Sequence, residues 1–410
     1  MTEQGGDRSL DVVVYGASGF VGRLVAEYLA ARADGLRVGL AGRSRDRLEA
    51  VRAELGPAAA TWRVVVADAA DDAALAELAR TTRVVATTVG PYTRHGLPLV
   101  RACAEAGTHY ADLAGEVLFL RDSARRFHDA AAATGARIVH SCGFDSVPSD
   151  LTVLLTSEQA RADGAGELRE ATLAVREISG GISGGTIDSM RVQVDAARDP
   201  ANRRALADPY VLLPDGVDPP RVDQHTPSRA FRDVLTGTWV APFPMAAFNT
   251  RVVHRSNALS GWAYGRELRY REVVDLGDGA RGRRRAQALA LGAGAAAAVM
   301  AVPPTRWLAD RLLPSPGDGP SEETRRTGHF RVEVLARTTS GARYRTTFAA
   351  QGDPGYAATA VMLGESVLGL AAEEGHLPGG GGVLTPATAL GPVLADRLVT
   401  AGFDITTARQ

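Results

Sequence analysis

Residues 11–22 read DVVVYGASGFVG, and this stretch decides the fold of the first part of the chain. Asp11–Tyr15 is a short apolar run, which predicts a buried strand. Gly16–Gly22 follows it with the spacing GxxGxxG, and apolar side chains then recur along one side of a predicted helix as far as Leu29. A strand, a glycine turn and an amphipathic helix in this order predict the first unit of a dinucleotide-binding fold.

The glycine turn predicts where the pyrophosphate of a dinucleotide binds. Glycine lets the backbone turn tightly and approach a phosphate without a Cβ clash. The N-terminus of the following helix offers free N–H groups and a partial positive charge. We therefore expect the residues of this turn to contact the cofactor, namely Gly16, Ser18, Gly19, Phe20, Val21 and Gly22.

The end of the second predicted strand decides between the two nicotinamide dinucleotides. NAD-binding units usually place Asp or Glu there to hold the ribose 2′-hydroxyl, whereas this chain has Gly42, Arg43 and Ser44. The guanidinium of Arg43 can pair with a 2′-phosphate and stack on adenine, and Ser44 can donate a hydrogen bond to the same phosphate. These residues predict NADP(H) as the cofactor. The alternative is that Arg43 is an ordinary solvated arginine.

Two further strand ends complete the predicted cofactor site. Asp68 ends the third strand, where a side chain often touches adenine, although it could instead be the N-cap of the following helix. The fourth strand ends at the carboxyl edge of the sheet, where ligands bind in open parallel sheets. We expect the nicotinamide to lie there, against Val89, Gly90, Pro91 and Tyr92.

The whole chain is predicted to be an α/β protein of two domains. Strand and helix signals alternate through residues 1–150, which predicts a Rossmann-type parallel sheet with helices on both faces. Residues 151–350 contain segments of period two, so we expect a second, α+β domain with an antiparallel sheet. Residues 351–410 are predicted to be C-terminal helices that pack back on the Rossmann domain. The strands expected in the second domain are Thr172–Ile178, Met190–Val194, Thr250–His254, Leu268–Val274 and the hairpin of Phe330–Thr338 with Tyr344–Ala349.

Length, charge and cysteine content limit the class of protein. A chain of 410 residues suits two domains, and its formal net charge of −1 does not favour a nucleic-acid partner. The two cysteines, Cys103 and Cys142, belong to no cluster with metal-ligand spacing, so no metal site is predicted. Met1–Ser9 has no apolar segment of a secretory signal, and we expect a cytoplasmic protein.

One apolar segment has two interpretations. Ala286–Val302 is almost entirely small and apolar, follows the basic run Arg281–Arg285, and reaches at most the ~20 apolar residues of a spanning helix. It is either a helix buried in the protein or in an interface, such as that of a homodimer, or a peripheral membrane contact through residues 281–304. A basic flank beside an apolar helix suits the anionic inner face of a membrane.

The motifs at the strand ends resemble those of a known family. Gly16–Gly22, Ala41–Ser44, Thr88–His95 (TVGPYTRH) and Cys142–Asp150 (CGFDSVPSD) are similar to the saccharopine dehydrogenase-like oxidoreductases, and within them to the actinobacterial trans-acting enoyl reductases. The resemblance implies an NADPH-dependent reduction of a C=C bond in an acyl thioester of polyketide or lipid biosynthesis, with a polyketide synthase as partner. One alternative is an NADP-dependent C–N dehydrogenase acting on an amino or imino acid. The other is a membrane-associated NADP-binding protein without turnover.

Reduction of an enoyl thioester indicates which side chains to seek. Hydride addition at Cβ leaves an enolate, which needs a hydrogen-bond donor on its oxygen and a proton at Cα. Tyr92 is the predicted donor, and His95 is predicted to tune Tyr92 or deliver the proton; the alternatives are packing for Tyr92 and a helix-start position for His95. Asp145 and Ser146 either cap the next helix or line the cleft. Gly180–Thr186 is an anion-binding turn or a plain loop before a helix.

Overall fold

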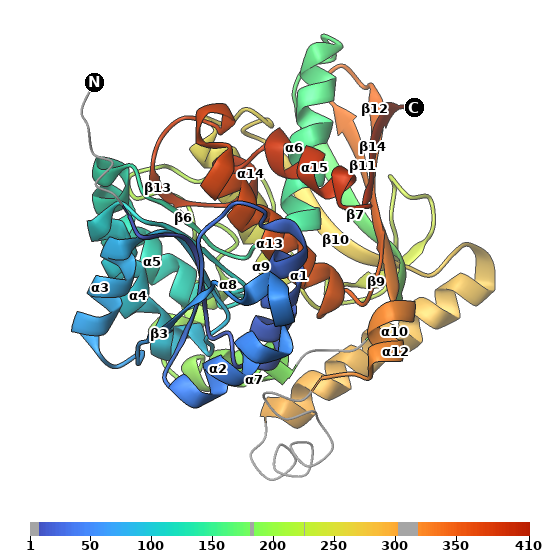
Figure 1. Cartoon of the computed structure of the whole chain (residues 1–410). Helices are drawn as coiled ribbons and strands as arrows, with labels where there is room; N and C mark the ends of the chain where they lie inside the picture. The colour runs from blue at the N-terminus through green and yellow to red at the C-terminus, as the bar shows by residue number, and fades with distance from the viewer. Residues whose placement is uncertain (1–7, 181–183, 225, 302–318) are drawn as a thin grey trace.

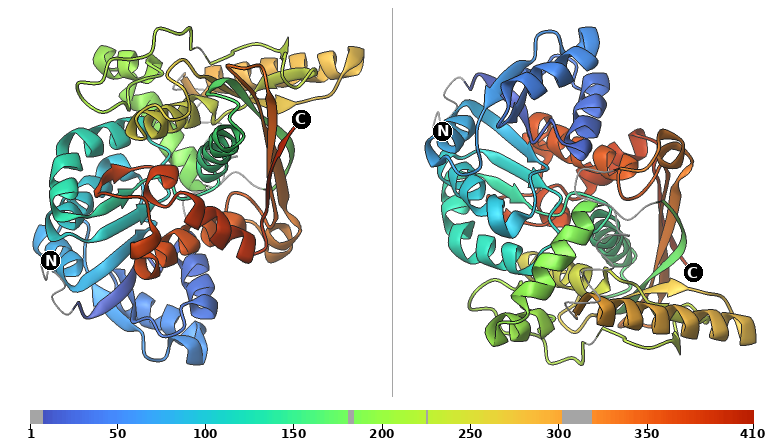
Figure 2. Two further views of the ribbon diagram at one scale, coloured as in Figure 1. Left: turned by 90° about the horizontal axis from the view of Figure 1, so that it is seen from above. Right: turned by 90° about the horizontal axis from the view of Figure 1, so that it is seen from below.

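The computed structural model describes residues 8–180, 184–224, 226–301 and 319–410 (Figure 1). Two seven-stranded sheets stand on opposite sides of the molecule, with helices between them (Figures 1 and 2). The chain is therefore α/β in its N-terminal part and mixed α+β in its second part, and the predicted fold class is confirmed.

The first sheet is parallel in every pairing and has the strand order β13-β6-β5-β4-β1-β2-β3. Its strands are almost entirely buried, apart from the exposed edge strand β3, as expected of a parallel sheet covered by helices. The strands are β1 (Leu10–Tyr15), β2 (Val38–Gly42), β3 (Arg63–Val66), β4 (Thr82–Thr87), β5 (His109–Asp112), β6 (Arg137–Val139) and β13 (Gly382–Leu384). The helices that connect them are α1 (Phe20–Arg32), α2 (Arg45–Glu54), α3 (Asp72–Thr81), α4 (Tyr92–Ala106) and α5 (Val117–Thr134).

The second sheet is mixed, with the order β14-β12-β11-β7-β10-β9-β8. Its only parallel pair within the described residues is β7 with β10, and its other pairs are antiparallel. The predicted hairpin is present as β11 and β12, joined at Gly341 in a left-handed conformation with φ +88°. The strands are β7 (Leu168–Ser179), β8 (Phe231–Arg232), β9 (Trp239–Pro242), β10 (Arg269–Asp275), β11 (His329–Thr338), β12 (Arg343–Gln351) and β14 (Asp404–Arg409).

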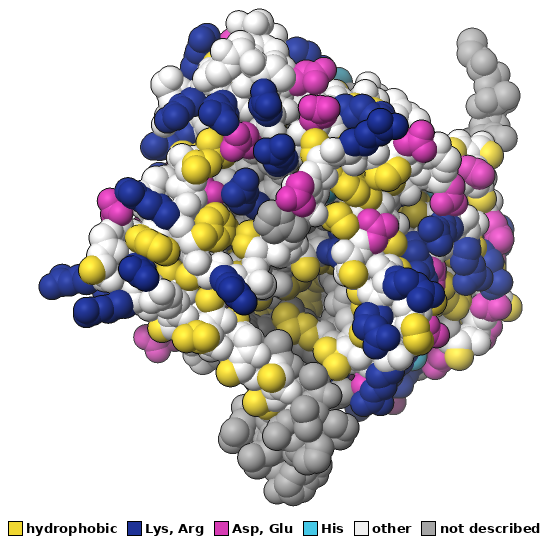
Figure 3. All heavy atoms as spheres, turned by 180° about the vertical axis from the view of Figure 1, so that it is seen from behind, with side chains coloured by type: hydrophobic (Ala, Val, Ile, Leu, Met, Phe, Trp, Pro, Cys, Tyr) yellow, Lys and Arg dark blue, Asp and Glu magenta, His cyan; other side chains and the backbone are white. Residues whose placement is uncertain are grey.

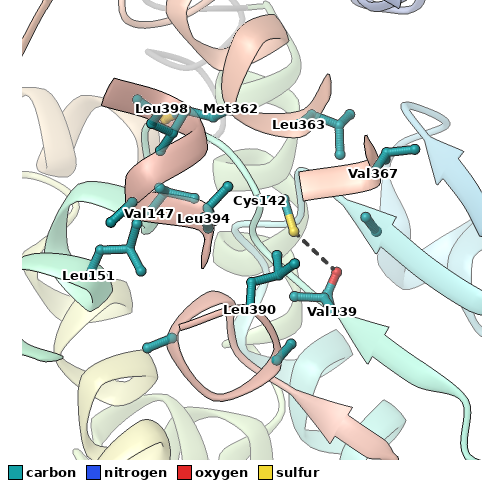
Figure 4. Close-up of a cluster of buried hydrophobic side chains, with 14 of the residues drawn as sticks. Val139, Cys142, Val147, Leu151, Met362, Leu363, Val367, Leu390, Leu394 and Leu398 are labelled. Carbon is teal, nitrogen blue, oxygen red and sulfur yellow. Dashed lines mark hydrogen bonds between the residues drawn. The ribbon is translucent and has the colours of Figure 1, made fainter. Parts of the chain in front are cut away.

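The helices between the sheets carry the shared core. A run of buried apolar side chains from α6, α13 and α15 packs beside the carboxyl end of β6 (Figure 4). Cys142 lies in this cluster, is fully buried and donates its S–H to the carbonyl of Val139, so it is a packing residue. These helices are α6 (Val147–Ala162), α13 (Ala357–Ala372), α14 (Pro386–Ala389) and α15 (Pro392–Thr400).

The last sixty residues contribute more than the predicted helices. Helix α13 packs against α1 and against β4 and β5 of the first sheet. Residues 382–384 also add strand β13 to the first sheet, and residues 404–409 add β14 to the second. The C-terminal segment thus joins the two sheets.

Two segments predicted as strands are helices. Met190–Val194 lies within α7 (Gly184–Ala196), and Thr250–His254 lies within α9 (Ala246–Leu259). In α9 every residue from Phe248 to Asn257 is buried, so tertiary burial outweighs the strand preference of its β-branched residues. Of the predicted Gly180–Thr186 turn, residues 181–183 lie outside the described residues.

The apolar segment after Arg281–Arg285 forms α10 (Gly279–Ala301), which lies beside β9 of the second sheet (Figure 1). Its described side chains beyond Gln287 are mostly exposed, with Leu291 75% and Leu289 42% exposed. The interpretation as a helix buried within this chain is therefore wrong. Among the described residues, no helix is long and apolar enough to cross a bilayer. The remaining described helices are α8 (Pro200–Ala207) and α12 (Glu322–Thr327), with short 3₁₀ turns at Gly56–Ala59 and Glu374–His376.

Candidate functional site

The glycine turn after β1 is shaped so that only glycine fits at two positions. Gly16 has φ +90°, and a Cβ there would lie 2.8 Å from Cγ2 of Val89. A Cβ on Gly22 would lie 2.1 Å from the carbonyl oxygen of Gly16. The missing side chains let α1 begin directly against the turn, and they bring the turn against the carboxyl end of β4.

The N-terminus of α1 is left open for an anion. Gly19 is its N-cap and provides no side-chain hydrogen bond, and the first turn of the helix holds no acidic residue. The free N–H groups and the helix dipole therefore point at the space above the turn. Phe20 contacts the second half of the chain, since its ring packs edge-on against Tyr356 at 5.1 Å and lies 5.4 Å under the guanidinium of Arg325.

Arg43 and Ser44 are available for a 2′-phosphate. Arg43 is exposed, and no described residue pairs with its guanidinium. Ser44 is the N-cap of α2, yet its hydroxyl makes no cap hydrogen bond. Arg45 and Arg47 follow, and Asp46 is the acidic residue of this first turn. An uncommitted arginine and hydroxyl at the end of β2 fit a phosphate on the ribose, so the residues present fit NADP(H).

Asp68 lies at the end of β3, exposed, and accepts a 2.9 Å hydrogen bond from the N–H of Ala70. The N-cap of α3 is Asp71, whose carboxylate accepts from the N–H groups of Ala73 and Ala74. The suggestion that Asp68 caps this helix is therefore wrong. Its place on the carboxyl edge leaves the adenine contact as a proposal.

Tyr92 lies where the sequence predicts, but its hydroxyl is engaged by the backbone. The hydroxyl donates to the carbonyl of Thr87 at 3.2 Å and accepts from the N–H of Leu113 at 3.2 Å. Burial, followed by the charge of Asp112, raises the pKa of Tyr92 well above its ordinary value. Its only hydrogen is thus committed to the protein, and this geometry argues against the predicted donor role.

His95 and Tyr92 do not come together at a reacting centre. His95 is exposed on the first turn of α4, its backbone N–H bonds the carbonyl of Pro91, and its side chain is absent from the cavity described below. This position matches the helix-start alternative. The predicted catalytic pair is therefore not assembled in this structure.

A cavity of about 420 Å³ lies above the carboxyl edge of the first sheet. The glycine turn and the ends of β4, β5 and β6 form its floor, and α7, α9 and the start of α13 form its walls. Its lining is largely apolar, with Val117, Phe144, Leu206, Met245 and Phe248. The surface seen from behind is hollowed, with hydrophobic side chains inside the hollow and arginines around it (Figure 3).

The cavity offers no uncommitted cation among its described lining residues. Arg251 is the one cationic side chain there, and its guanidinium donates to the backbone carbonyls of Asp208, Leu206 and Ala247. The lining carboxylates are Asp145 and Asp188. A dicarboxylate amino acid requires cationic partners, so this wall is unsuited to such a substrate.

Asp145 lies in the cavity wall and not on a helix cap, since the N-cap residue of α6 is Ser146. A Cβ added at Gly115 would lie 3.7 Å from Oδ2 of Asp145 and 3.8 Å from Cε of Met245, so both side chains lie close to Gly115 in the cavity. No described residue donates a hydrogen bond to it, and burial raises its pKa to about 6.

Glu116 fastens the wall of the cavity. Its carboxylate accepts from the N–H groups of Tyr92 at 2.9 Å and Thr93 at 2.8 Å, and so caps the start of α4. It also accepts from the hydroxyl of Ser189 on α7. Gln193, one turn further along α7, donates to the carbonyl of Gly115 at 3.2 Å. No sequence motif indicates Glu116, because its partners come from separate elements.

A buried polar network shapes the end of β6. Asp112 contacts Nδ1 of His140 at 2.7 Å, and Nε2 of His140 contacts the hydroxyl of Ser123 at 2.7 Å. Asp112 also accepts from the N–H of Ser141, which has the left-handed φ of +65°. Asp112, His140 and Ser123 are at most 2% exposed, so this Asp-His-Ser arrangement positions the backbone and does not meet substrate. Among the described residues, no group of three His, Cys, Asp or Glu is placed to hold a metal ion.

Comparison with known proteins identifies the family. Residues 12–139 match the model of the saccharopine dehydrogenase NADP binding domain. A candidate trans-acting enoyl reductase of Mycobacterium tuberculosis is 49% identical, with 98% of each chain covered. The trans-acting enoyl reductases of Mycobacterium bovis and Mycobacterium ulcerans are 45% and 46% identical, with at least 98% of each chain covered. The chain belongs to the trans-acting enoyl reductase family.

The fold of this family member is also that of a solved structure. Saccharopine dehydrogenase (L-Glu forming) from Saccharomyces cerevisiae has a TM-score of 0.53 over 97% of this chain and 99% of the yeast chain, at 13% identity. At that identity the likeness shows the fold alone. The NADP-binding match confirms the cofactor predicted from Arg43 and Ser44, and the chain is an NADP-dependent oxidoreductase. Which residues contact the cofactor stays a proposal for Gly16, Ser18, Gly19, Phe20, Val21, Gly22, Gly42, Arg43, Ser44, Asp68, Val89, Gly90, Pro91 and Tyr92.

Proposed function

We propose that this chain is a trans-acting enoyl reductase that reduces the C=C bond of an acyl thioester carried by a polyketide synthase. Bound NADPH supplies the hydride. The observation that carries the proposal is the largely apolar cavity beside the NADP-binding turn, whose one described cation, Arg251, is engaged by three backbone carbonyls. An acyl chain suits such a wall, and a charged amino acid does not.

The chain's own residues orient and enclose the reactants. The N-terminus of α1 would hold the pyrophosphate of the cofactor, Arg43 would hold its 2′-phosphate, and Gly90 and Pro91 at the end of β4 would contact its nicotinamide. Ser189 and Gln193 keep α7 against the floor of the cavity and so limit the entry of water. A thioester enters from the side of Met245 and Phe248, which supply apolar contacts for the acyl chain.

The test is NADPH oxidation by the full chain against a panel of enoyl thioesters and imino acids. Reduction of enoyl thioesters, with the saturated product seen by mass spectrometry, is the expected result. Reduction of imino acids alone would instead support the C–N dehydrogenase alternative. Oxidation of NADPH by neither class would contradict the proposed function. A thioester on an isolated acyl carrier domain, compared with one on a short thiol, tests whether the synthase is a partner.

We also propose peripheral membrane contact through residues 281–304, of which 302–304 lie outside the described residues. Helix α10 exposes Leu289, Leu291 and Val299, and the basic run at its start is exposed at Arg281, Arg284 and Arg285. Cosedimentation with anionic phospholipid vesicles, and its loss in the R281E/R284E/R285E variant, is the expected result. If the chain does not cosediment with vesicles but forms a dimer as its concentration rises, α10 would be assigned to a homodimer interface.

A further inference from the structure

The reduction requires a proton donor in the same cavity as the nicotinamide, because hydride and proton add to adjacent carbons. The hydroxyl groups of the wall are unsuited, since most donate their hydrogen to protein acceptors. Ser141 donates to the carbonyl of Ala114, Ser189 to Glu116, Thr359 to the carbonyl of Pro354, Thr88 to the carbonyl of Gly16 and Tyr92 to the carbonyl of Thr87. The remaining candidate donors among the described lining residues are the carboxyl groups of Asp145 and Asp188 and the hydroxyl of Tyr356.

The two carboxyl groups differ in their surroundings. Asp188 is on α7, where it lies 4.0 Å from Arg191, and its side chain is 27% exposed. Asp145 follows β6 and lines the cavity, where its Oδ2 would lie 3.7 Å from a Cβ added at Gly115, and no described residue donates a hydrogen bond to it. A carboxyl without a donor is stabilised in its protonated form, which is the form that can deliver a proton.

We propose that Asp145 is the catalytic acid that protonates Cα of the enolate. This inference rests on the proposed function. Hydride addition at Cβ moves the C=C electron pair to give the enolate. The Oδ–H bond of Asp145 then breaks as a C–H bond forms at Cα, the carbonyl of the thioester is restored, and Asp145 is left as a carboxylate. Water protonates it again before the next turnover.

Burial of Asp145 sets the pH range of the protonation step. Burial raises the pKa of Asp145 to about 6, and burial also raises the pKa of Glu272 on β10 to about 7 and that of Asp150 on α6 to about 6. Asp188 on α7 and Arg251 on α9 face the same cavity. Because the protonated form is the donor, the rate of the protonation step falls as pH rises above the pKa of Asp145.

The experiment compares wild type with Asp145→Asn and Asp145→Glu in D₂O. Wild type is expected to place deuterium on one face of Cα. We expect Asp145→Asn to lose on the order of 100-fold in single-turnover rate, to label both faces, and to bind NADPH normally. We expect Asp145→Glu to restore part of the rate. A single labelled face and a rate within threefold of wild type in Asp145→Asn would overturn the inference.

Further measurements distinguish Asp145 from the other candidate proton donors. In the ligand-free chain, ¹³C NMR of aspartate carboxyls is expected to show a resonance that titrates near pH 6 and is missing in Asp145→Asn; a carboxyl that titrates near pH 4 would contradict the proposal. Asp188→Asn and Glu272→Gln are expected to keep one-face labelling. Loss of one-face labelling in Tyr356→Phe, with Asp145→Asn normal, would assign the proton to Tyr356. If wild type reduces no enoyl thioester, the proposed function fails, while the NMR result still tests Asp145.

Discussion

The hydroxyl of Ser189 donates a 2.9 Å hydrogen bond to Oε1 of Glu116, and the same oxygen accepts from the N–H of Tyr92. One carboxylate thus holds both α7, which follows the first strand of the second sheet, and the start of α4, which follows the predicted nicotinamide position. Helix α7 in the wall of the cavity is thus linked to its floor, where the nicotinamide is predicted to bind.

Ser189→Ala removes this link and is expected to loosen α7. A hydrogen bond to a charged group contributes about 1.5–3 kcal/mol, so amide exchange in residues 188–196 should become at least tenfold faster. The affinity for NADPH should change little, because the glycine turn is untouched. Hydrogen exchange with mass spectrometry measures residues 188–196 and the glycine turn in the same experiment. Ser321→Ala, which removes the N-cap hydroxyl of α12, is the control. Equal exchange of residues 188–196 in Ser189→Ala and Ser321→Ala would contradict the link.

Arg43→Ala is expected to weaken NADPH binding by about 10- to 100-fold and NADH binding hardly at all. The physical reason is the loss of a charge-assisted contact to the 2′-phosphate, which NADH lacks. Quenching or enhancement of nicotinamide fluorescence gives both affinities. Arg343→Ala, an exposed arginine on the second sheet, is the control. Equal losses for the two cofactors would remove Arg43 from phosphate recognition.

Gly22→Ala is expected to impair both NADPH binding and stability. The added methyl would lie 2.1 Å from the carbonyl oxygen of Gly16, so α1 must shift away from the turn, at a cost of about 1–3 kcal/mol. Thermal unfolding with and without NADPH measures both effects. Gly294→Ala is the matched control, because nothing lies within 4 Å of its added methyl and it is also in a helix. Normal binding by Gly22→Ala would show that the turn does not need this close approach.

Tyr92→Phe is expected to act mainly on stability. It leaves the carbonyl of Thr87 and the N–H of Leu113 without their partner, at a cost of about 1–3 kcal/mol. Urea unfolding measures the loss, and the reaction should keep its pH dependence and its stereochemistry at Cα. A stable variant with turnover lowered more than tenfold would restore the sequence-based role of Tyr92 as a donor to the enolate.

Glu272→Gln is expected to change how stability depends on pH. Burial raises the pKa of Glu272 from 4.5 to about 7, so between these values the folded protein binds a proton that the unfolded chain has released. The free energy of unfolding of wild type therefore falls as pH rises through this window, by on the order of 3 kcal/mol from this residue. Urea unfolding at pH 5 and pH 8 should show a smaller fall in Glu272→Gln. The exposed Glu267→Gln should keep the wild-type fall.

The sequence predicts the cofactor half of the site because its signals are local. Gly16–Gly22 and Arg43–Ser44 carry their chemistry within a few residues. No described side chain caps the start of α1, and no described residue pairs with the Arg43 guanidinium or takes the Ser44 hydroxyl as a helix cap. The parallel sheet and the hairpin of the second domain follow from strong apolar periods. These features need no knowledge of distant partners.

The half of the site that would meet the substrate could not be predicted, because it depends on contacts between elements far apart in the sequence. Only the fold shows that the hydroxyl of Tyr92 donates to the carbonyl of Thr87 and accepts from the N–H of Leu113, and that no described residue donates a hydrogen bond to Asp145. Met190–Val194 alternates like a strand, yet in α7 the same segment places Gln193 one turn from Ser189, over the cavity. Burial and partner choice, which decide these roles, are properties of the assembled chain.

The C-terminal strands have a consequence for synthesis of the chain on the ribosome. Because β13 and β14 each complete a sheet that begins hundreds of residues earlier, the two sheets lack these strands until residues 382–384 and 404–409 have been translated. Until then β6 and β12 are open edges that can pair with other chains. A nascent chain that stalls before residue 404 lacks the strand that covers β12, so an unfinished copy differs from a finished one by exposed strand edges that chaperones and proteases can recognise.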